Sequence, residues 1–124
     1  MKQVVIILCL INSLFSFSQN RDLEFVTTIS GRKDILKMSK SEFKKKNIEA
    51  RTIIKPKRWE VKQYKIKINY DQVFTVEGYR ITNEIKEYLD YAKKNSKIVI
   101  FEVVVKDKDA TYTNIKPITI YTID

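Results

Sequence analysis

The sequence predicts a mainly β protein, an antiparallel β-sandwich of immunoglobulin-like character with one packed amphipathic helix and one shorter helix. Apolar residues alternate with polar ones in several runs along the chain, which is typical of strands that bury one face. Two stretches depart from this alternation. Residues 82–94 have apolar residues spaced three and four apart, and residues 39–47 begin with a helix-capping pattern.

The chain is organised around residues 82–105, which predict a helix followed at once by a strand. Thr82 can accept hydrogen bonds from the free amides of the first turn, and Asn95 can take the left-handed conformation that ends a helix. Lys93 and Lys94 would then lie in the last turn, where the helix dipole favours cations. Residues 98–105 are apolar on both faces except at Glu102, which predicts a central, covered strand.

The other elements are predicted from local signals. Ser39 and Glu42 form a capping box, so we expect a short helix to about residue 47 with Phe43 as its anchor. The apolar residues of 58–70 change phase midway, which requires a bulge near Lys62 or Gln63. Further strands are expected at 23–30, ended by a turn at Gly31, and at 48–54, 73–77 and 111–123. The last of these segments contains Pro117, which has no amide hydrogen to donate to a neighbouring strand. It is therefore expected to be an edge strand, or its amide side faces away from the neighbouring strand at Pro117.

The first 18 residues are predicted to be a secretory signal peptide, cleaved after Ser18, which leaves residues 19–124 as a single domain. Lys2 precedes an apolar run at 4–11, and the small residues Ser16 and Ser18 stand immediately before the expected cleavage site, as signal peptidase requires. A buried strand and a membrane anchor are the alternatives, although the run is shorter than the ~20 residues that span a bilayer. After cleavage no cysteine remains, and no membrane anchor is expected in the mature chain.

Charge is concentrated in one half of the protein. The net charge is +9, and residues 32–67 alone carry 14 Lys and Arg against 4 Asp and Glu, a difference of +10. This half could recognise an anionic polymer such as lipopolysaccharide, whereas nucleic acid is not expected as a partner. The alternative is a solvated surface, which the excess of lysine over arginine favours. The candidate polyanion-binding residues are Lys44, Lys45, Lys46, Lys55, Lys57, Arg58, Lys65 and Lys67.

The sequence offers little catalytic chemistry. There is no histidine, and two glycines are too few for a phosphate-binding loop, so we expect no enzyme activity, small-molecule substrate, cofactor or metal. Glu102 would be a candidate proton donor if it were buried, but a position at the rim or paired with a lysine is favoured. Trp59 could stack on a ligand, although a core position is favoured. Tyr91 lies off the apolar stripe of its helix and is the candidate protein-contact residue.

Four segments of the chain carry a resemblance to a known family: GRKDILKMSKSEFKKKNIEARTII, RWEVKQYKIKIN, NEIKEYLDYAKKNSKIVIFEVVVKDKD and NIKPITIYTI. With these segments, most of the mature chain resembles the C-terminal domain of the GldM/PorM family, exported proteins of the type IX secretion and gliding machinery of Bacteroidetes. The resemblance covers residues 31–124. Turn residues differ: the family tends to have glycine where Asn95 and Ser96 stand, and a glycine-rich turn at 107–110. The resemblance implies the fold, export and protein–protein contact, but not the motor function of the family's membrane helix.

Two functions are therefore expected from the sequence. The first is an exported, non-enzymatic protein–protein interaction domain of the bacterial cell envelope, periplasmic or extracellular, that binds an envelope or secreted protein through a sheet edge or a helix face. The alternative is a secreted basic module that binds anionic polymers. Salt separates the two, because polyanion binding falls steeply as the salt concentration rises.

Overall fold

The computed structural model describes residues 24–53, 58–70, 72–108 and 110–124, which form a mainly β protein with two helices. The expected signal peptide lies outside these residues and stays a prediction. In chain order the elements are β1 (Phe25–Thr28), β2 (Ile35–Met38), α2 (Lys40–Lys44), β3 (Glu49–Thr52), β4 (Arg58–Ile68), β5 (Gln72–Glu77), α3 (Asn83–Tyr91), β6 (Lys97–Lys106), β7 (Thr111–Tyr112), β8 (Ile115–Lys116) and β9 (Ile118–Thr122).

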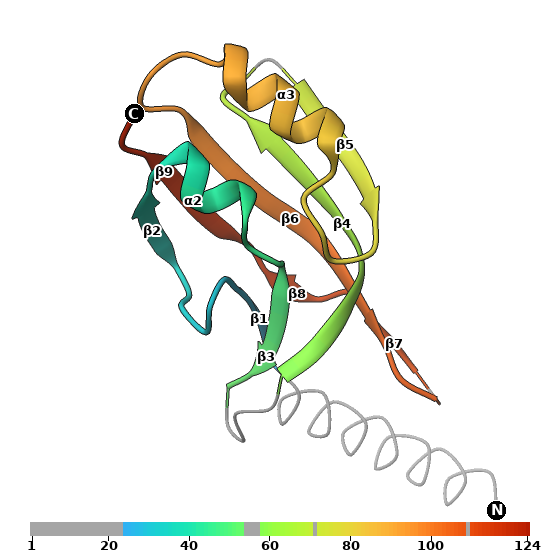
Figure 1. The fold of residues 1–124 in the computed structure, drawn as a ribbon. Helices are drawn as coiled ribbons and strands as arrows, with labels where there is room; N and C mark the ends of the chain where they lie inside the picture. The colour runs from blue at the N-terminus through green and yellow to red at the C-terminus, as the bar shows by residue number, and fades with distance from the viewer. Residues whose placement is uncertain (1–23, 54–57, 71, 109) are drawn as a thin grey trace, which may run out of the picture.

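The strands form one curled, mixed sheet in the order β2-β9-β6-β4-β3-β1-β8, with β5 added to β4 and β7 added to β6 (Figure 1). Strand β4 links the part of the sheet that contains β3, β1 and β8 to the part that contains β5, β6, β9 and β2. Its first residues pair with β3 and its later residues with β5 along the same edge, while β6 pairs along the other edge. The central position predicted for 98–105 is confirmed, since β6 has β4 on one side and β9 and β7 on the other.

The mainly β class and the two helices are confirmed, but an immunoglobulin-like sandwich is not. The strands follow one continuous path of pairings, and two of the pairings, β1 with β8 and β2 with β9, are parallel. The expected strand at 111–123 is in fact three short strands. Pro117 separates β8, which pairs with β1, from β9, which pairs with β6. Because Pro117 has no amide hydrogen to donate, it suits the point where the chain exchanges one partner strand for another.

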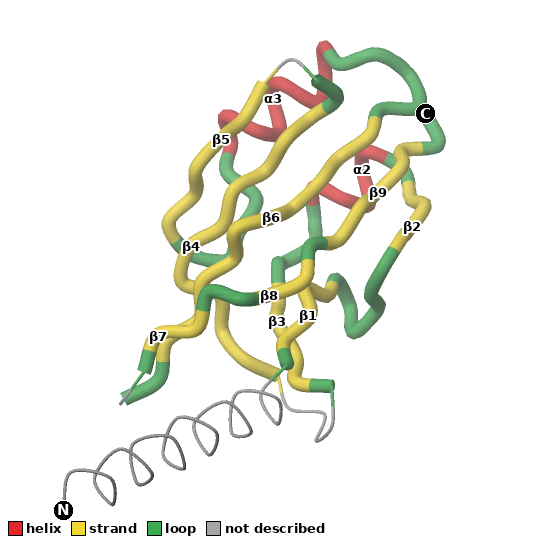
Figure 2. The backbone as a smooth tube through the Cα atoms, turned by 180° about the vertical axis from the view of Figure 1, so that it is seen from behind, coloured by secondary structure: helices red, strands yellow, loops and turns green. Residues whose placement is uncertain are grey.

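Both helices lie on the same face of the sheet, and the opposite face of β5, β4, β6, β9 and β2 carries no helix in the described part of the chain (Figures 1 and 2). Helix α3 buries Ile85 and Leu89 against the sheet, and Thr82 caps it by accepting a hydrogen bond from the Ile85 amide at 3.4 Å. Helix α2 buries only Phe43, as predicted. The capping box is present in its first half, since the Ser39 hydroxyl accepts from the Glu42 amide at 3.0 Å.

Both helices end earlier than their sequence predicts. Helix α3 ends at Tyr91 instead of residue 94, and Ala92 is already extended, so Lys93 and Lys94 are not in its last turn. Asn95 does adopt a left-handed conformation (φ 56°), but in the following turn. Helix α2 ends at Lys44 instead of about residue 47. Hydrogen bonds from residues 95–97 to distant parts of the chain explain why α3 stops.

The predicted bulge in β4 is confirmed, and β6 carries a second one that compensates for it. The register between β4 and β6 shifts by one residue between Val61 and Gln63, then shifts back by Lys65. The second shift falls at Glu102 of β6, whose φ of 47° places it in the left-handed region. The extra residue of a bulge has no partner in the neighbouring strand, and the bulge changes the direction of its side chain. Glu102 is accordingly exposed and pairs with Lys65 at 2.6 Å, which confirms the favoured interpretation of this carboxylate.

Replacement of the buried Tyr64 by phenylalanine is expected to lower the free energy of unfolding by about 1–2 kcal/mol at neutral pH. The Tyr64 hydroxyl donates to the carbonyl of Arg80 at 2.6 Å, and the variant leaves that carbonyl without this donor. Burial also raises the pKa of Tyr64 above its ordinary value. The stabilisation from the neutral phenol is therefore complete below the unfolded pKa of about 10 and is lost as the pH rises above it, because the unfolded chain ionises first.

The measurement is urea denaturation between neutral pH and about pH 11, with Tyr70→Phe as the control. Tyr70 is 81% exposed, so its variant should follow the wild type. Above about pH 10 the wild type should lose stability more steeply than Tyr64→Phe, by up to about 1.4 kcal/mol per pH unit. Equal slopes for the wild type and Tyr64→Phe would contradict the assigned burial of the phenol.

Candidate functional site

An aromatic groove lies between strand β5 and helix α3. It consists of two neighbouring hollows of about 380 and 310 Å³ that share the side chains of Tyr88 and Tyr91. We call it the β5–α3 groove. The first hollow is lined by Gln72, Phe74, Glu84, Glu87, Tyr88 and Tyr91, and the second by Asn69, Tyr70, Tyr88, Tyr91, Ala92 and Lys93.

The periodicity of α3 places these side chains. Ile85 and Leu89 face the core, so residues 84, 87, 88 and 91 form a stripe on another side of the helix, spaced three and four apart. Phe74 of β5 fixes the position of the stripe, because its ring packs edge-on against Tyr88 with 5.5 Å between ring centroids. The helix face beside β5 is therefore aromatic, with two carboxylates on its rim.

Two tyrosines of the groove have side chains that are almost fully exposed to solvent. Tyr91 is 92% exposed, as predicted from its position off the apolar stripe, and Tyr70 is 81% exposed. Tyrosine is enriched at protein interfaces because its ring buries a large apolar area while its hydroxyl remains hydrated. Glu84 and Glu87 take no part in the ion pairs formed among the described residues, so their charges are available to a partner.

Strand β5 presents a free edge beside this groove. It pairs with β4 along one side, and among the described residues no strand pairs with its other side. A strand of six residues with one free edge has backbone donors and acceptors that an extended peptide can pair with. The edge and the aromatic stripe together could hold both the backbone and the side chains of such a peptide.

The candidate polyanion-binding residues that the structure describes are not brought together. Lys44, Lys45 and Lys46 lie at the end of α2, on the helix side of the sheet, whereas Lys65 and Lys67 lie on the opposite face. Several of these bases pair with carboxylates: Lys44 with Asp90, Lys46 with Glu42 at 3.9 Å, Arg58 with Glu49 at 3.6 Å and Lys65 with Glu102 at 2.6 Å. Lys55 and Lys57 lie outside the described residues.

Lysines do gather on the helix-free face of the sheet, and two of them, Lys37 and Lys97, are not among the candidates chosen from the sequence. Burial of residues 64, 66 and 68 of β4 turns Lys65 and Lys67 to this face, and the same alternation turns Lys97 of β6 and Lys37 of β2 there. Lys97 and Lys37 both neighbour Tyr121 of β9 in the strand register, and Lys67 neighbours Val99. The alternation of buried and exposed residues in each strand indicates which face each lysine takes. The lysines of different strands can be assigned to one surface only when the order of the strands is known.

Two further findings concern metal ligands and membrane-spanning helices. Within the described ranges no group of three His, Cys, Asp or Glu side chains is placed to hold a metal ion. None of the helices in the described part of the chain is long and apolar enough to cross a membrane.

Comparison with known proteins does not place the chain in a family. No protein-family model matches the sequence, and a search of curated proteins finds no significant match. The resemblance to the GldM/PorM C-terminal domain therefore stays a prediction from the sequence.

Proposed function

We propose that this chain is an exported, non-enzymatic protein–protein interaction domain of the bacterial cell envelope, related to the GldM C-terminal domain. The carrying observation is the free edge of β5 beside the exposed tyrosines of the β5–α3 groove. An extended segment of the partner would add to β5 through backbone hydrogen bonds and place side chains against Tyr88 and Tyr91. Export and the relation to GldM rest on the sequence features described above.

The chemistry of the groove also restricts the partner segment. Aromatic rings line the groove, so a large apolar or aromatic side chain of the partner would bury the most surface there. Glu84 and Glu87 on the rim favour a segment that carries lysine or arginine. The expected partner is therefore an envelope or secreted protein with an extended, basic and aromatic segment.

Capture of the partner at two salt concentrations tests this proposal. The immobilised protein is incubated with native envelope extract and washed at about 0.05 M and then about 1 M salt, where the Debye length falls to about 3 Å. A discrete protein that remains bound at high salt supports a strand-edge interface with an apolar component. Release of all bound material at high salt, with lipopolysaccharide in the eluate, contradicts it.

The second candidate function is the binding of an anionic polymer, favoured by one specific observation. Four lysines, Lys37, Lys65, Lys67 and Lys97, share the helix-free face, with Glu102 as a counter-charge. If these lysines neutralise phosphates, the affinity for lipopolysaccharide should fall steeply with the salt concentration, and a Lys37→Glu/Lys97→Glu variant should make the salt dependence shallower. An unchanged salt dependence in that variant would exclude this face as the binding surface.

A further inference from the structure

A third hollow lies where β4 exchanges one partner strand for another. Strand β3 pairs with β4 up to the Glu49–Glu60 pair, and β5 pairs with it from Gln63 onward. The Ile48 amide donates to the Tyr79 carbonyl at 2.8 Å and joins the start of β3 to the chain that follows β5. Beside this junction lies a cavity of about 400 Å³, which we call the junction pocket. It is lined by Asn47, Ile48, Glu49, Arg58, Trp59, Glu60 and Tyr79.

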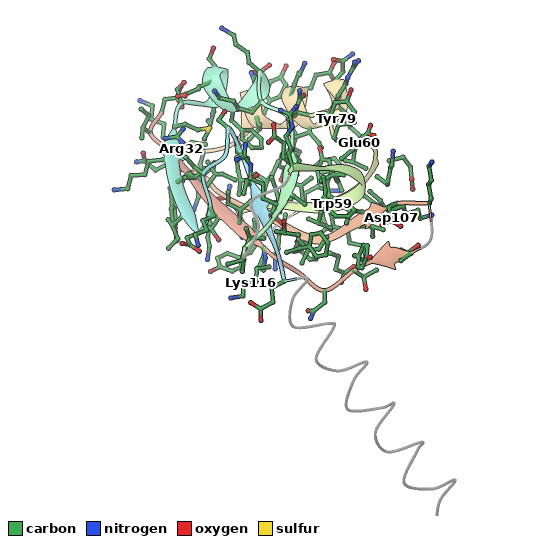
Figure 3. All side chains as sticks on the ribbon, turned by 90° about the horizontal axis from the view of Figure 1, so that it is seen from below. Arg32, Trp59, Glu60, Tyr79, Asp107 and Lys116 are labelled. Atoms are coloured by element: carbon green, nitrogen blue, oxygen red, sulfur yellow. The ribbon has the colours of Figure 1, made fainter. Side chains whose placement is uncertain are left out.

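The pocket has two aromatic walls held in place by their neighbours. Trp59 is half-buried, and its ring packs edge-on against Phe25 and Tyr112, with ring centroids 5.4 and 5.8 Å away. Tyr79 is also half-buried, and the Arg80 guanidinium lies 5.6 Å from its ring centroid. Trp59, Glu60 and Tyr79 line this pocket and lie close together in the view from below (Figure 3). Trp59 thus packs against the core, as the sequence favoured, and also contributes to the wall of a cavity.

The polar side chains of the pocket supply both hydrogen-bond acceptors and donors. Glu49 and Glu60 stand directly opposite each other across β3 and β4, an arrangement that costs free energy for two like charges. Arg58 and Asn47 add donors, and Asn47 is also an acceptor. The pocket can therefore serve a ligand that both donates and accepts hydrogen bonds.

The Glu49 carboxylate beside the pocket has one unsatisfied oxygen. Oxygen Oε2 of Glu49 is buried and has no hydrogen-bond partner among the described residues. The Arg51 guanidinium is 3.8 Å from this oxygen, and Arg58 lies 3.6 Å from the other oxygen; both distances are beyond ordinary hydrogen-bond length. A buried acceptor without a donor is unfavourable. Because Oε2 is closed to solvent, a ligand in the pocket would bond to the other carboxylate oxygen, Oε1, of this partly exposed side chain.

The charges around the pocket nearly cancel. Arg58 offsets Glu49, and Lys62 pairs with Glu60 at 2.8 Å. A strongly charged ligand would therefore gain little attraction, whereas a neutral ligand with several hydroxyl groups could use every polar group. The volume lies at the small end of the range of ligand pockets, roughly 300–1,000 Å³.

We propose that the junction pocket binds a neutral sugar unit of a glycan, with the apolar face of the ring against Trp59 or Tyr79 and its hydroxyl groups bonded to Glu49, Glu60, Asn47 and Arg58. Aromatic walls suit the carbon–hydrogen face of a sugar, and carboxylate, amide and guanidinium groups suit its hydroxyl groups. This inference does not depend on the β5–α3 groove, because the two sites share no residue.

Trp59 provides a direct readout, because it is the only tryptophan in the protein. The purified protein is titrated with maltose, cellobiose, lactose and diacetylchitobiose, and tryptophan emission is followed. We expect a saturable change with at least one disaccharide, at a dissociation constant of about 1 mM, that is little altered by salt because the ligand is neutral. The absence of a saturable change with every disaccharide up to about 50 mM would overturn the proposal.

Variants locate the binding. Tyr79→Ala removes one wall and Glu49→Gln removes the carboxylate; each should weaken binding at least about tenfold while Trp59 still reports it. Tyr121→Ala and Glu102→Gln make the same chemical changes on the helix-free face and should bind as the wild type does. Circular dichroism shows whether each variant is folded. If Tyr79→Ala does not fold, the affinity of Glu49→Gln decides the test. Wild-type affinity in a folded pocket variant would overturn the proposal.

Discussion

Phe43→Ala is expected to lower the free energy of unfolding by about 3–5 kcal/mol. Phe43 is fully buried and is the only residue of α2 that reaches the core. A helix of five residues has no stability of its own and depends on the packing of its apolar side chain. Lys40, whose ammonium donates to the Ala92 carbonyl at 2.8 Å, and Lys44, which pairs with Asp90, join α2 to the end of α3. Loss of the Phe43 anchor therefore weakens this contact between the helices as well.

Urea denaturation of Phe43→Ala measures the loss directly, with Ser41→Ala as the matched control. Ser41 is exposed on the same helix, so its replacement should change the free energy of unfolding by no more than about 0.5 kcal/mol. A total stability of about 5–15 kcal/mol is ordinary for a domain, so Phe43→Ala removes a large part of it. Equal midpoints for the two variants would show that α2 is not anchored through Phe43.

Tyr91→Ala is expected to weaken binding of the envelope partner at least about tenfold without destabilising the protein. Tyr91 lies in both hollows of the β5–α3 groove, and its 92% exposure means that the fold gains little from its ring. An exposed tyrosine beside a free strand edge is the type of residue that contributes most to interface affinity. The measurement is the dissociation constant of the captured partner, together with the urea midpoint of the variant.

Tyr121→Ala is the matched control, because Tyr121 is 36% exposed on the helix-free face of the sheet and lies outside the groove. It should bind the partner with wild-type affinity. If Tyr121→Ala weakens binding and Tyr91→Ala does not, the partner contacts the helix-free face and the groove is not the site.

Local signals predicted much of the fold. The cap at Thr82, the anchor at Phe43 and the bulge in β4 follow from the spacing of neighbouring residues, and each is present. The compensating bulge at Glu102 was missed because it left no visible change of phase: the residues of β6 on either side are apolar whichever face they take. Helix α3 was expected to be longer because Lys93 and Lys94 are favourable in the last turn of a helix and Asn95 can take the conformation that ends one.

Contacts between distant segments decided the features that the sequence could not. The Ser96 amide donates to the Thr122 hydroxyl at 2.7 Å, and the Lys97 amide donates to the Asn69 side chain at 3.0 Å. The Asn95 amide donates to the Asp124 carbonyl at 3.0 Å. These bonds draw the chain out of the helix after Tyr91 despite its helix propensity. The parallel pairs β1–β8 and β2–β9 join residues from the two ends of the described chain, so no local pattern could reveal them.

The candidate site, like the fold, was predictable where it depends on local spacing and not where it depends on contacts between distant segments. Helical periodicity placed Tyr91 on an exposed face, because that required only the spacing from Ile85 and Leu89. The groove depends on β5 lying beside α3, which is set by the pairing of β5 with β4 and could not be derived from either segment alone. The bases grouped by sequence are separated for the same reason where the structure describes them: Lys44 of α2 lies on the helix side of the sheet, and Lys65 and Lys67 of β4 lie on the opposite face.

Amide hydrogen exchange of the protein with and without its partner tests the central claim most directly. If the partner segment adds to β5, the amides of Gln72–Glu77 that point away from β4 should exchange more slowly in the complex, together with the exposed side of α3. The edge strand β2 provides an internal comparison and should be unaffected. Unchanged exchange throughout β5 in a saturated complex would contradict the account.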